Sequence, residues 1–511
     1  MGEKKRVAIN MISQLTSFVV GLAISFVLTR QIAKLLGKDI YGFVGMGNTF
    51  TSYVTVFTVA LNSMLNRYVT IELKQKKYDN ARMYFSSVAI ADTIIALMLV
   101  IPATIMVLFI DKLFEVPAGH VGDIQLLWLF IFANFLFSLA TSAFGTATYA
   151  TNRLDLSGKR SVESNLIKAA ILIIAYVFFE PKVWYMGLAA FVCGAYCSVT
   201  NIRYCKKLTP QLTIKKAYYK FKAVKELVTI GIWSSINQLT QTLINGLDLI
   251  FANKLLGALE MSLMSYSKTV PVQLISLISM VSGVFAPQMT LAYAEGNMEK
   301  FKDNTNMAIK ICGFFCSVPI MGFISFGTPF FELWLPMLTA EEIKTVQLLS
   351  VLALLPNVFS VYIFPLYSVN NITRKLKVPV MVTMAVGIIN VIAVPILVKY
   401  TNLGLLGIKL VSSVLLTARV LIFVPIYAAH NIGCKWTTFY KPLTRGVLSN
   451  IMILLLFYIV NRQVEIDSWL MLAIVGGICG AAAYVINYIV VLNQNEKLEV
   501  LKMVKKVFKR G

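Results

Sequence analysis

Residues 378–400 read VPVMVTMAVGIINVIAVPILVKY, an apolar stretch with a single charged residue, Lys399, near its end. Three basic residues, Arg374, Lys375 and Lys377, come just before it. A helix rises about 1.5 Å per residue, so a stretch of this length can cross the roughly 30 Å hydrocarbon core of a bilayer. The pattern therefore predicts a transmembrane helix.

Blocks of the same kind recur along the whole chain of 511 residues. They lie near 11–36, 41–65, 84–110, 122–151, 162–179, 184–204, 226–252, 264–293, 306–328, 343–370, 378–400, 404–428, 444–461 and 468–493. The composition agrees, because 58% of the residues are hydrophobic and 14% are charged, whereas soluble domains carry about 25% charged residues. We predict an all-α polytopic membrane protein with about 14 transmembrane helices. The first block lacks a small-residue cleavage motif and is too long for a signal peptide, so we expect a retained helix.

The net charge of +23 is distributed between the apolar blocks and does not form one basic face, which argues against a nucleic-acid partner. With the N-terminus placed in the cytoplasm, 33 Lys and Arg residues fall on the inner side, 9 on the outer side and 5 within the membrane. Basic residues in short loops favour the cytoplasmic side. We therefore predict a membrane protein with both termini in the cytoplasm.

Cysteine and histidine usage limits the chemistry. Five of the seven cysteines lie inside apolar blocks, and the chain has two histidines. This pattern forms neither a disulfide framework nor a zinc motif. We expect no metal, no cofactor and no catalytic residues.

Short motifs recur at a spacing of about 220 residues. Ile12-Ser13-Gln14-Leu15-Thr16 is echoed by Ile236-Asn237-Gln238-Leu239-Thr240, and Lys34-Leu35-Leu36-Gly37 by Lys254-Leu255-Leu256-Gly257. Repeats of this length are typical of transporters. We predict an N-terminal six-helix bundle at 1–204, a basic cytoplasmic linker at 205–225 and a second six-helix bundle at 226–428. Two further helices follow at 429–493, and a basic cytoplasmic tail follows at 494–511.

Ionisable residues at membrane depth usually face an interior or a water-filled cavity. Leaving out the two residues at each block end, the predicted helices contain seven cations and two carboxylates: Arg30, Lys34, Lys168, Lys268, Lys310, Lys409 and Arg419, with Asp92 and Asp248. Lys34 and Lys409 lie towards the outer ends of their helices and belong to the nine basic residues on the outer side. A cationic lumen suits an anionic cargo, and Arg30, Lys268 and Arg419 are candidates for contact with it. The alternative is pairing between helices, or extension of the side chain to the membrane surface.

Polar residues at helical spacing predict the inward faces. They are Asn48, Thr55 and Asn62 on the second helix, and Asn237, Gln241 and Asp248 on the seventh. Such residues also join helices to one another. Because the first, second, seventh and eighth helices all carry them, we predict that these four helices line a central cavity.

The motif Arg30-x-x-x-Lys34-Leu35-Leu36-Gly37-x-x-x-Tyr41-Gly42 closes the first helix after a short basic N-terminus. It resembles the opening signature of bacterial polysaccharide (O-antigen-type, lipid-linked oligosaccharide) flippases. These belong to the multidrug/oligosaccharidyl-lipid/polysaccharide exporter superfamily. The resemblance implies a V-shaped pair of six-helix bundles with two added helices. It also implies that cations of the first, second, seventh and eighth helices line the lumen, where Arg30, Arg67 and Lys268 occupy comparable places.

The resemblance implies a protein of the bacterial inner membrane with a function in surface polysaccharide biosynthesis, such as that of lipopolysaccharide O-antigen. The cargo would be an undecaprenyl-diphosphate-linked oligosaccharide that moves from the inner to the outer leaflet by alternating access. Polysaccharide polymerase and glycosyltransferases would then be partners. One alternative is a multidrug or cation antiporter of the same superfamily, which would have more carboxylates in its cavity. The other is a membrane enzyme of polysaccharide assembly, which usually has a longer external loop.

Overall fold

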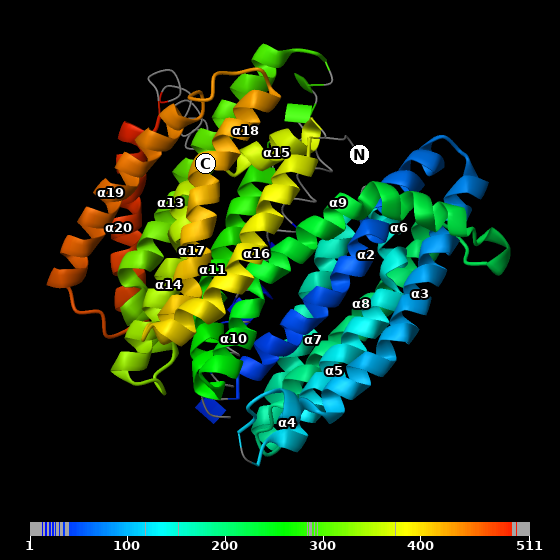
Figure 1. Cartoon of the computed structure of the whole chain (residues 1–511), viewed down its shortest axis with the longest axis horizontal. Coiled ribbons are helices and arrows are strands. Elements are labelled where there is room, and N and C mark those ends of the chain that lie inside the picture. Colours follow the sequence, from blue (N-terminus) through cyan, green and yellow to red (C-terminus); the bar gives the residue numbers. More distant parts are fainter. Residues whose placement is uncertain are drawn as a thin grey trace, which may run out of the picture. The chain divides into compact units, whose positions relative to one another are not determined.

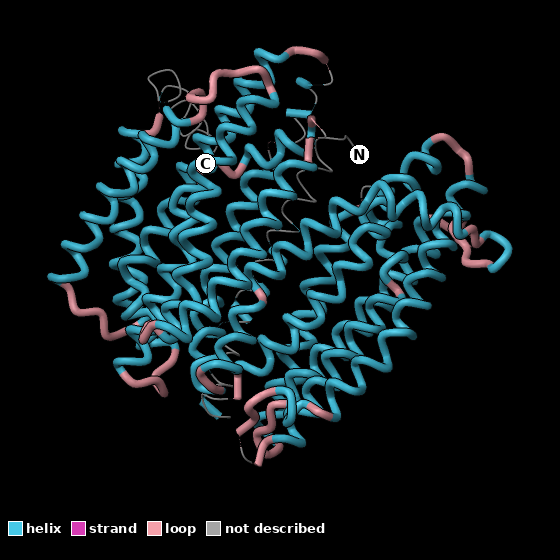
Figure 2. Tube along the Cα trace, in the orientation of Figure 1, coloured by secondary structure: helices cyan, strands magenta, loops and turns pink. Residues whose placement is uncertain are grey.

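The computed structural model describes residues 40–117, 119–151, 153–283, 295–373 and 375–492, with single residues or pairs elsewhere before 40, between 285 and 293, and at 497. Within these, the backbone alone is described for residues 53–54, 56–58, 60, 63, 230, 234 and 245. Of the predicted helix at 11–36, 11 residues are described, singly or in pairs, and of the predicted tail at 494–511 only Lys497 is described. The described part forms helices joined by short loops and contains no strand (Figure 2).

Contacts between residues divide the chain into two compact units, Met1–Ser265 and Tyr266–Gly511. The boundary lies in helix α11 (Ala258–Gly283), beyond the predicted linker at 205–225. This division rests on spatial contacts, whereas the predicted bundles rest on sequence repeats. The predicted domain boundaries stay a prediction.

The first unit consists of antiparallel helices that pack side by side (Figure 1). They are α2 (Gly42–Lys74), α3 (Tyr78–Leu108), α4 (Ile110–Leu113), α5 (Val121–Ala140), η1 (Ser142–Gly145), α6 (Thr146–Ala150), α7 (Leu154–Phe178), α8 (Trp184–Leu208), η2 (Lys216–Tyr218), α9 (Phe221–Asn245) and α10 (Leu247–Leu255). Helix α2 packs against α9, α3 and α5, and α8 packs against α5 and α7. Trp128 of α5 is fully buried, and its indole nitrogen donates to the Phe43 carbonyl at 3.2 Å. A buried indole needs such a partner, so this bond fixes the start of α2 against α5.

The second unit contains the rest of α11 and the helical elements that follow it. They are α13 (Met298–Trp334), α14 (Ala340–Ser360), α15 (Pro365–Ile372), α16 (Lys377–Tyr400), α17 (Gly404–Ala418), the π-helical turn η3 (Arg419–Phe423), α18 (Val424–Asn431), α19 (Tyr440–Gln463) and α20 (Trp469–Val490). Helix α17 packs against α14 and α16, and α13 packs against α14, α19 and α20. The last two helices are thus part of the same compact unit as α13 (Figure 1).

Buried polar side chains tie α19 and α20 to the rest of this unit. Ser449 of α19 donates to Asn487 Oδ1 of α20 at 2.7 Å. Asn487 Nδ2 in turn donates to the Phe314 carbonyl and to Ser317 Oγ of α13, both at 2.9 Å. The side chains of this hydrogen-bond network all have a partner. The network therefore holds α13, α19 and α20 in one register without leaving a buried polar group unsatisfied.

The structure confirms the predicted all-α polytopic fold. Ten helices in the described part are long and apolar enough to span a membrane; the predicted total of fourteen stays a prediction. The helix bounds differ where a helix continues past its apolar block, because hydropathy does not detect a polar extension. Thus α2 runs to Lys74 where 41–65 was predicted, and α13 spans Met298–Trp334 where 306–328 was predicted.

Candidate functional site

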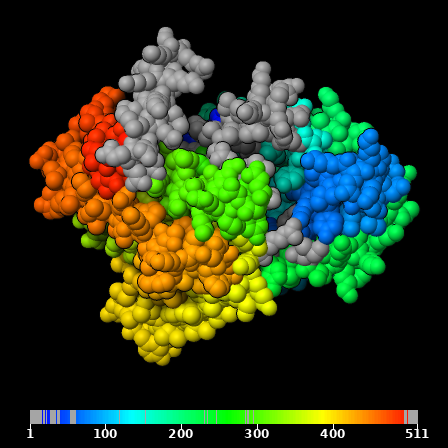
Figure 3. Space-filling model, turned by 90° about the horizontal axis from the view of Figure 1, so that it is seen from above, coloured from blue at the N-terminus to red at the C-terminus, as the bar shows by residue number. Residues whose placement is uncertain are grey.

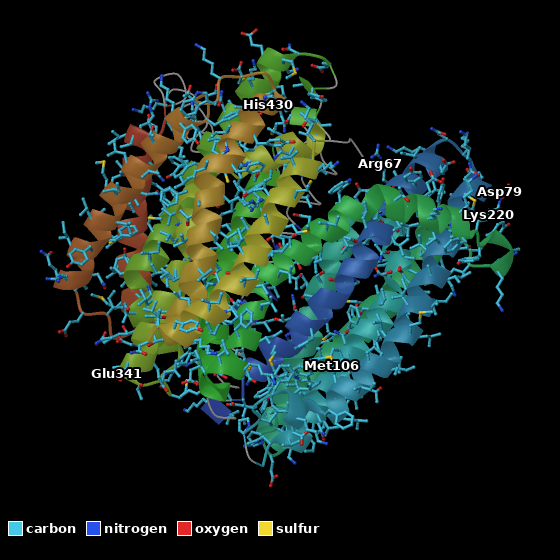
Figure 4. All side chains as sticks on the ribbon, viewed as in Figure 1. Arg67, Asp79, Met106, Lys220, Glu341 and His430 are labelled. Carbon is cyan, nitrogen blue, oxygen red and sulfur yellow. The ribbon has the colours of Figure 1, made fainter. Side chains whose placement is uncertain are left out.

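The four cations predicted to bind cargo are distributed evenly over the two units. Arg30 is half-buried and Arg67 of α2 is exposed, both in the first unit. Lys268 of α11 and Arg419 are half-buried residues of the second unit. Figure 4 shows Arg67 at the same end of the first unit as Asp79 and Lys220, while Met106 lies towards the other end. Arg67 is therefore a residue of the helix end, close to the basic loop, and not of mid-membrane depth.

Arg419 has an unusual environment. It begins the π-helical turn that interrupts the path from α17 to α18, and turns of this kind occur frequently at functional sites. Its guanidinium lies 5.6 Å from the ring centroid of Tyr367 on α15, within the range of a cation–π contact. Its Nε is buried and has no hydrogen-bond partner among the described residues. This guanidinium is thus held in place and keeps an unused donor.

The polar residues at the start of α2 differ in exposure. Asn48 has an exposed side chain, and its carbonyl accepts from the hydroxyls of Thr51 and Ser52 at 2.8 and 3.0 Å. Thr55 is half-buried and donates to the Ser52 carbonyl at 2.7 Å. These hydroxyl groups bond within their own helix, and the side chain of Asn48 is a polar group that this segment presents at its surface.

Asn62, further along α2, belongs to a polar cluster inside the first unit. Ser142 Oγ lies 3.2 Å from Asn62 Oδ1 and 2.5 Å from Asp92 Oδ2. Asp92 is fully buried in α3, and its Oδ1 has no hydrogen-bond partner in the described part of the chain. A buried carboxyl group at membrane depth is costly and marks a candidate functional position.

One helical turn further on, the same two segments are joined again. Thr146 Oγ1 donates to Asn66 Oδ1 at 2.7 Å. Sequence reasoning missed Ser142, Asn66 and Thr146. The signal was present as Asn-x-x-x-Asn at 62–66 and Ser-x-x-x-Thr at 142–146, two pairs at a spacing that places each pair on one helical face. Nothing in the local pattern indicates that these two faces meet.

The seventh predicted helix is divided in two. A turn at Gly246 separates α9 from α10, so Asn237, Gln241 and Asp248 do not follow one uninterrupted helical face, which the prediction assumed. Asn237 is exposed, Gln241 is half-buried, and Asp248 is buried in the first turn of α10. The Leu249 amide donates to Asp248 Oδ1 at 3.0 Å. A Cβ atom on Gly246 would lie 2.7 Å from a Thr49 methyl group, so the turn lies where α2 approaches closely.

Two glycines of α2 also mark a close approach. The Gly42 amide donates to Ser262 Oγ at 3.0 Å, and a Cβ atom on Gly45 would lie 2.8 Å from Ser265 Oγ. Both pairs are separated by 220 residues, which is the spacing at which Lys34–Gly37 recurs as Lys254–Gly257. The start of α2 therefore contacts the start of α11 through residues that correspond in the sequence repeat.

Comparisons with known proteins give the fold. No protein-family model matches this chain. The chain is 29% identical over 498 residues to the uncharacterized membrane protein EpsK of Bacillus subtilis (strain 168), covering 98% of each protein. An inward-facing multidrug resistance MATE family transporter of the MOP superfamily superposes with a TM-score of 0.67 at 16% identity, over 85% of this chain and 98% of that one. The lipid II flippase MurJ, in an inward closed conformation, superposes with a TM-score of 0.64 at 15% identity, over 94% and 98%.

Proposed function

We propose that this chain is a flippase that moves an undecaprenyl-diphosphate-linked oligosaccharide from the cytoplasmic to the outer leaflet by alternating access. The observation that carries the proposal is the excess of seven cations over two carboxylates in the predicted membrane helices. The fold shared with MATE transporters and MurJ supports a transport function of this kind.

The physical reason is the chemistry of the cargo. A diphosphate with a sugar head cannot cross hydrocarbon unaided, because charged and polar groups lose their hydration there. Arg30, Lys268 and Arg419 would replace that hydration with charge-assisted hydrogen bonds, which are about twice as strong as neutral ones. Polar groups such as Asn48 and Asn237 would contact the sugars, while the prenyl tail stays in lipid. No bond of the cargo changes, so the proposed function is not enzymatic.

The contacts between α2 and α11 support a repeat of two related bundles. Gly42 with Ser262, and Gly45 with Ser265, are pairs at the repeat spacing of 220 residues.

A cation-coupled antiporter is the second candidate, and Asp92 is the observation that favours it. Its buried carboxyl with one unpartnered oxygen is the kind of group that binds a proton or Na⁺ during transport. One such carboxyl can also couple cation movement to cargo export in a flippase. Only a transport measurement separates the two candidates.

The test reconstitutes the purified protein in vesicles with a fluorescent undecaprenyl-diphosphate oligosaccharide and measures its movement with an impermeant quencher. We expect flipping by the wild type. Because a hydrogen bond to a charged group contributes about 1.5–3 kcal/mol, Arg419→Ala should weaken cargo binding about 10- to 100-fold. Arg30→Ala and Lys268→Ala should act similarly, with Lys399→Ala at an exposed helix end as the matched control.

Two results would contradict the proposal. One is full flipping by all three alanine variants at normal reconstituted amounts. The other is cation-driven movement of a multidrug substrate such as ethidium with no movement of the lipid-linked sugar, which would identify an antiporter.

A further inference from the structure

A cavity of about 410 Å³ lies in the second unit, between the first half of α13 and the start of α19. Its lining includes three cations, Lys310, Lys441 and Arg445, and one carboxylate, Asp303. Thr438 adds a hydroxyl group at the rim. The cavity therefore carries a formal excess of two positive charges and would favour an anion.

The two helices present these residues from single faces. Asp303 and Lys310 are seven residues apart on α13, and Lys441 and Arg445 are four residues apart on α19, so each pair lies on one side of its helix. The start of α19 adds little to this positive charge, because the Tyr440 amide donates to the Thr437 carbonyl at 3.1 Å and Pro442 has no amide hydrogen. Lys441 and Arg445 are exposed, so the cavity is accessible from outside the unit.

The surroundings place this cavity at the level of lipid headgroups. Trp436, in the loop just before α19, is 61% exposed and packs edge-on against Tyr440 at 5.9 Å. Exposed tryptophan and tyrosine are enriched where a membrane meets water. Figure 3 looks onto the end of the second unit that carries the loop between α18 and α19, drawn in orange at the surface.

Below Arg445, the same face of α19 becomes apolar. Leu448, Met452 and Leu455 follow Arg445 at i+3, i+7 and i+10, and they are 54%, 43% and 58% exposed. If the phosphate group of a lipid binds at Arg445, the acyl chains of that lipid can lie along these three apolar side chains. A soluble anion has no acyl chains and would not contact them.

We propose that this cavity binds the headgroup of an anionic phospholipid, with the phosphate between Lys441, Arg445 and Lys310 and the acyl chains along α19. Basic pockets between transmembrane helices on the cytoplasmic side are suited to such headgroups, and this end of α19 is predicted to be cytoplasmic. The site is separate from the proposed cargo residues Arg30, Lys268 and Arg419. The packing of α19 against α13 would then depend on the amount of anionic lipid in the surrounding membrane.

The test uses the purified full-length protein in a neutral detergent with dioctanoyl phosphatidylglycerol as the probe and dioctanoyl phosphatidylcholine as the neutral reference. Binding is measured by native mass spectrometry. We expect phosphatidylglycerol to bind at least tenfold more tightly. Each basic residue near an anionic lipid surface contributes about a fivefold factor, so Lys441→Gln with Arg445→Gln should weaken binding about 25-fold.

Two variants and one competitor make the result decisive. The exchange Lys441→Arg with Arg445→Lys keeps both charges and should retain binding, and Lys377→Gln, an exposed cation of α16 outside the cavity, should not change it. Equal binding of the two lipids, or undiminished binding by the double Gln variant, would overturn the proposal. Displacement of the lipid by inorganic phosphate at equal concentration would assign the site to a soluble anion instead.

Discussion

Tyr362 lies in the turn between α14 and α15 and packs against α13 and α19, and this packing predicts a strong effect of one added methyl group. The side chain is 1% exposed, and its hydroxyl donates to the Gly446 carbonyl at 3.0 Å or to Asn450 Oδ1 at 2.8 Å. A Cβ atom on Gly446 would lie 2.3 Å from the ring, and one on Gly313 would lie 2.2 Å from it. The ring therefore packs directly against the backbone of Gly313 on α13 and of Gly446 on α19.

The perturbation is Gly446→Ala. An ordinary contact of a Cβ atom is about 3.4–4 Å, so the ring would have to move by more than 1 Å, and Gly313 on its other face blocks the movement. Overpacking of this kind costs about 1–3 kcal/mol. A displaced hydroxyl leaves Asn450 Oδ1 unsatisfied, which costs about a further 1–3 kcal/mol. The gain in helix propensity from glycine to alanine is about 1 kcal/mol, so we expect a net loss of at least 1 kcal/mol.

The assay is thermal unfolding of the purified protein in detergent, followed with a thiol-reactive dye. Cys312 and Cys316 on α13 and Cys479 on α20 are buried, so they react when these helices separate. Gly480→Ala on α20 is the matched control, because a Cβ atom there has no described neighbour within 4 Å and should leave the unfolding temperature unchanged or raise it. If Gly446→Ala unfolds at the same temperature as Gly480→Ala, the packing argument is refuted.

Three further predictions follow from the first unit. Gly42→Ala should lower the unfolding temperature relative to Gly122→Ala, because its Cβ atom would lie 2.8 Å from Ser262 Oγ while nothing lies within 4 Å at Gly122; equal temperatures would contradict this. Asp92→Asn should reach normal membrane abundance on an immunoblot, since an amide oxygen can still accept from Ser142, whereas Asp92→Leu should not, because it removes the carboxylate oxygen to which Ser142 Oγ donates at 2.5 Å; normal abundance of the Leu variant would contradict this structural role. A cysteine placed in the exposed part of the 205–225 loop should resist an impermeant thiol reagent in intact cells, and labelling would reverse the predicted orientation.

The helices themselves follow from the sequence, because the free energy of placing a segment in a bilayer depends mainly on its own side chains. The apolar block at 378–400 corresponds to α16 (Lys377–Tyr400), and the block at 468–493 to α20 (Trp469–Val490). Four of the five cysteines that this reasoning placed in apolar blocks are buried, whereas Cys197 is half-buried. The same reasoning underestimated the lengths of α2 and α13, because the polar ends of both helices continue as helix beyond the apolar blocks.

The partners of the polar residues were decided by tertiary structure alone. Asn62 and Ser142 are 80 residues apart and Tyr362 and Asn450 are 88 apart, and helical periodicity indicates which face a residue occupies but not which helix packs on that face. The π-helical turn at Arg419, its contact with Tyr367 and the break at Gly246 depend in the same way on neighbouring helices. The cationic cavity between α13 and α19 forms because packing brings Lys310 and Arg445 together. These residues are 135 positions apart, and no sequence pattern indicates that they meet.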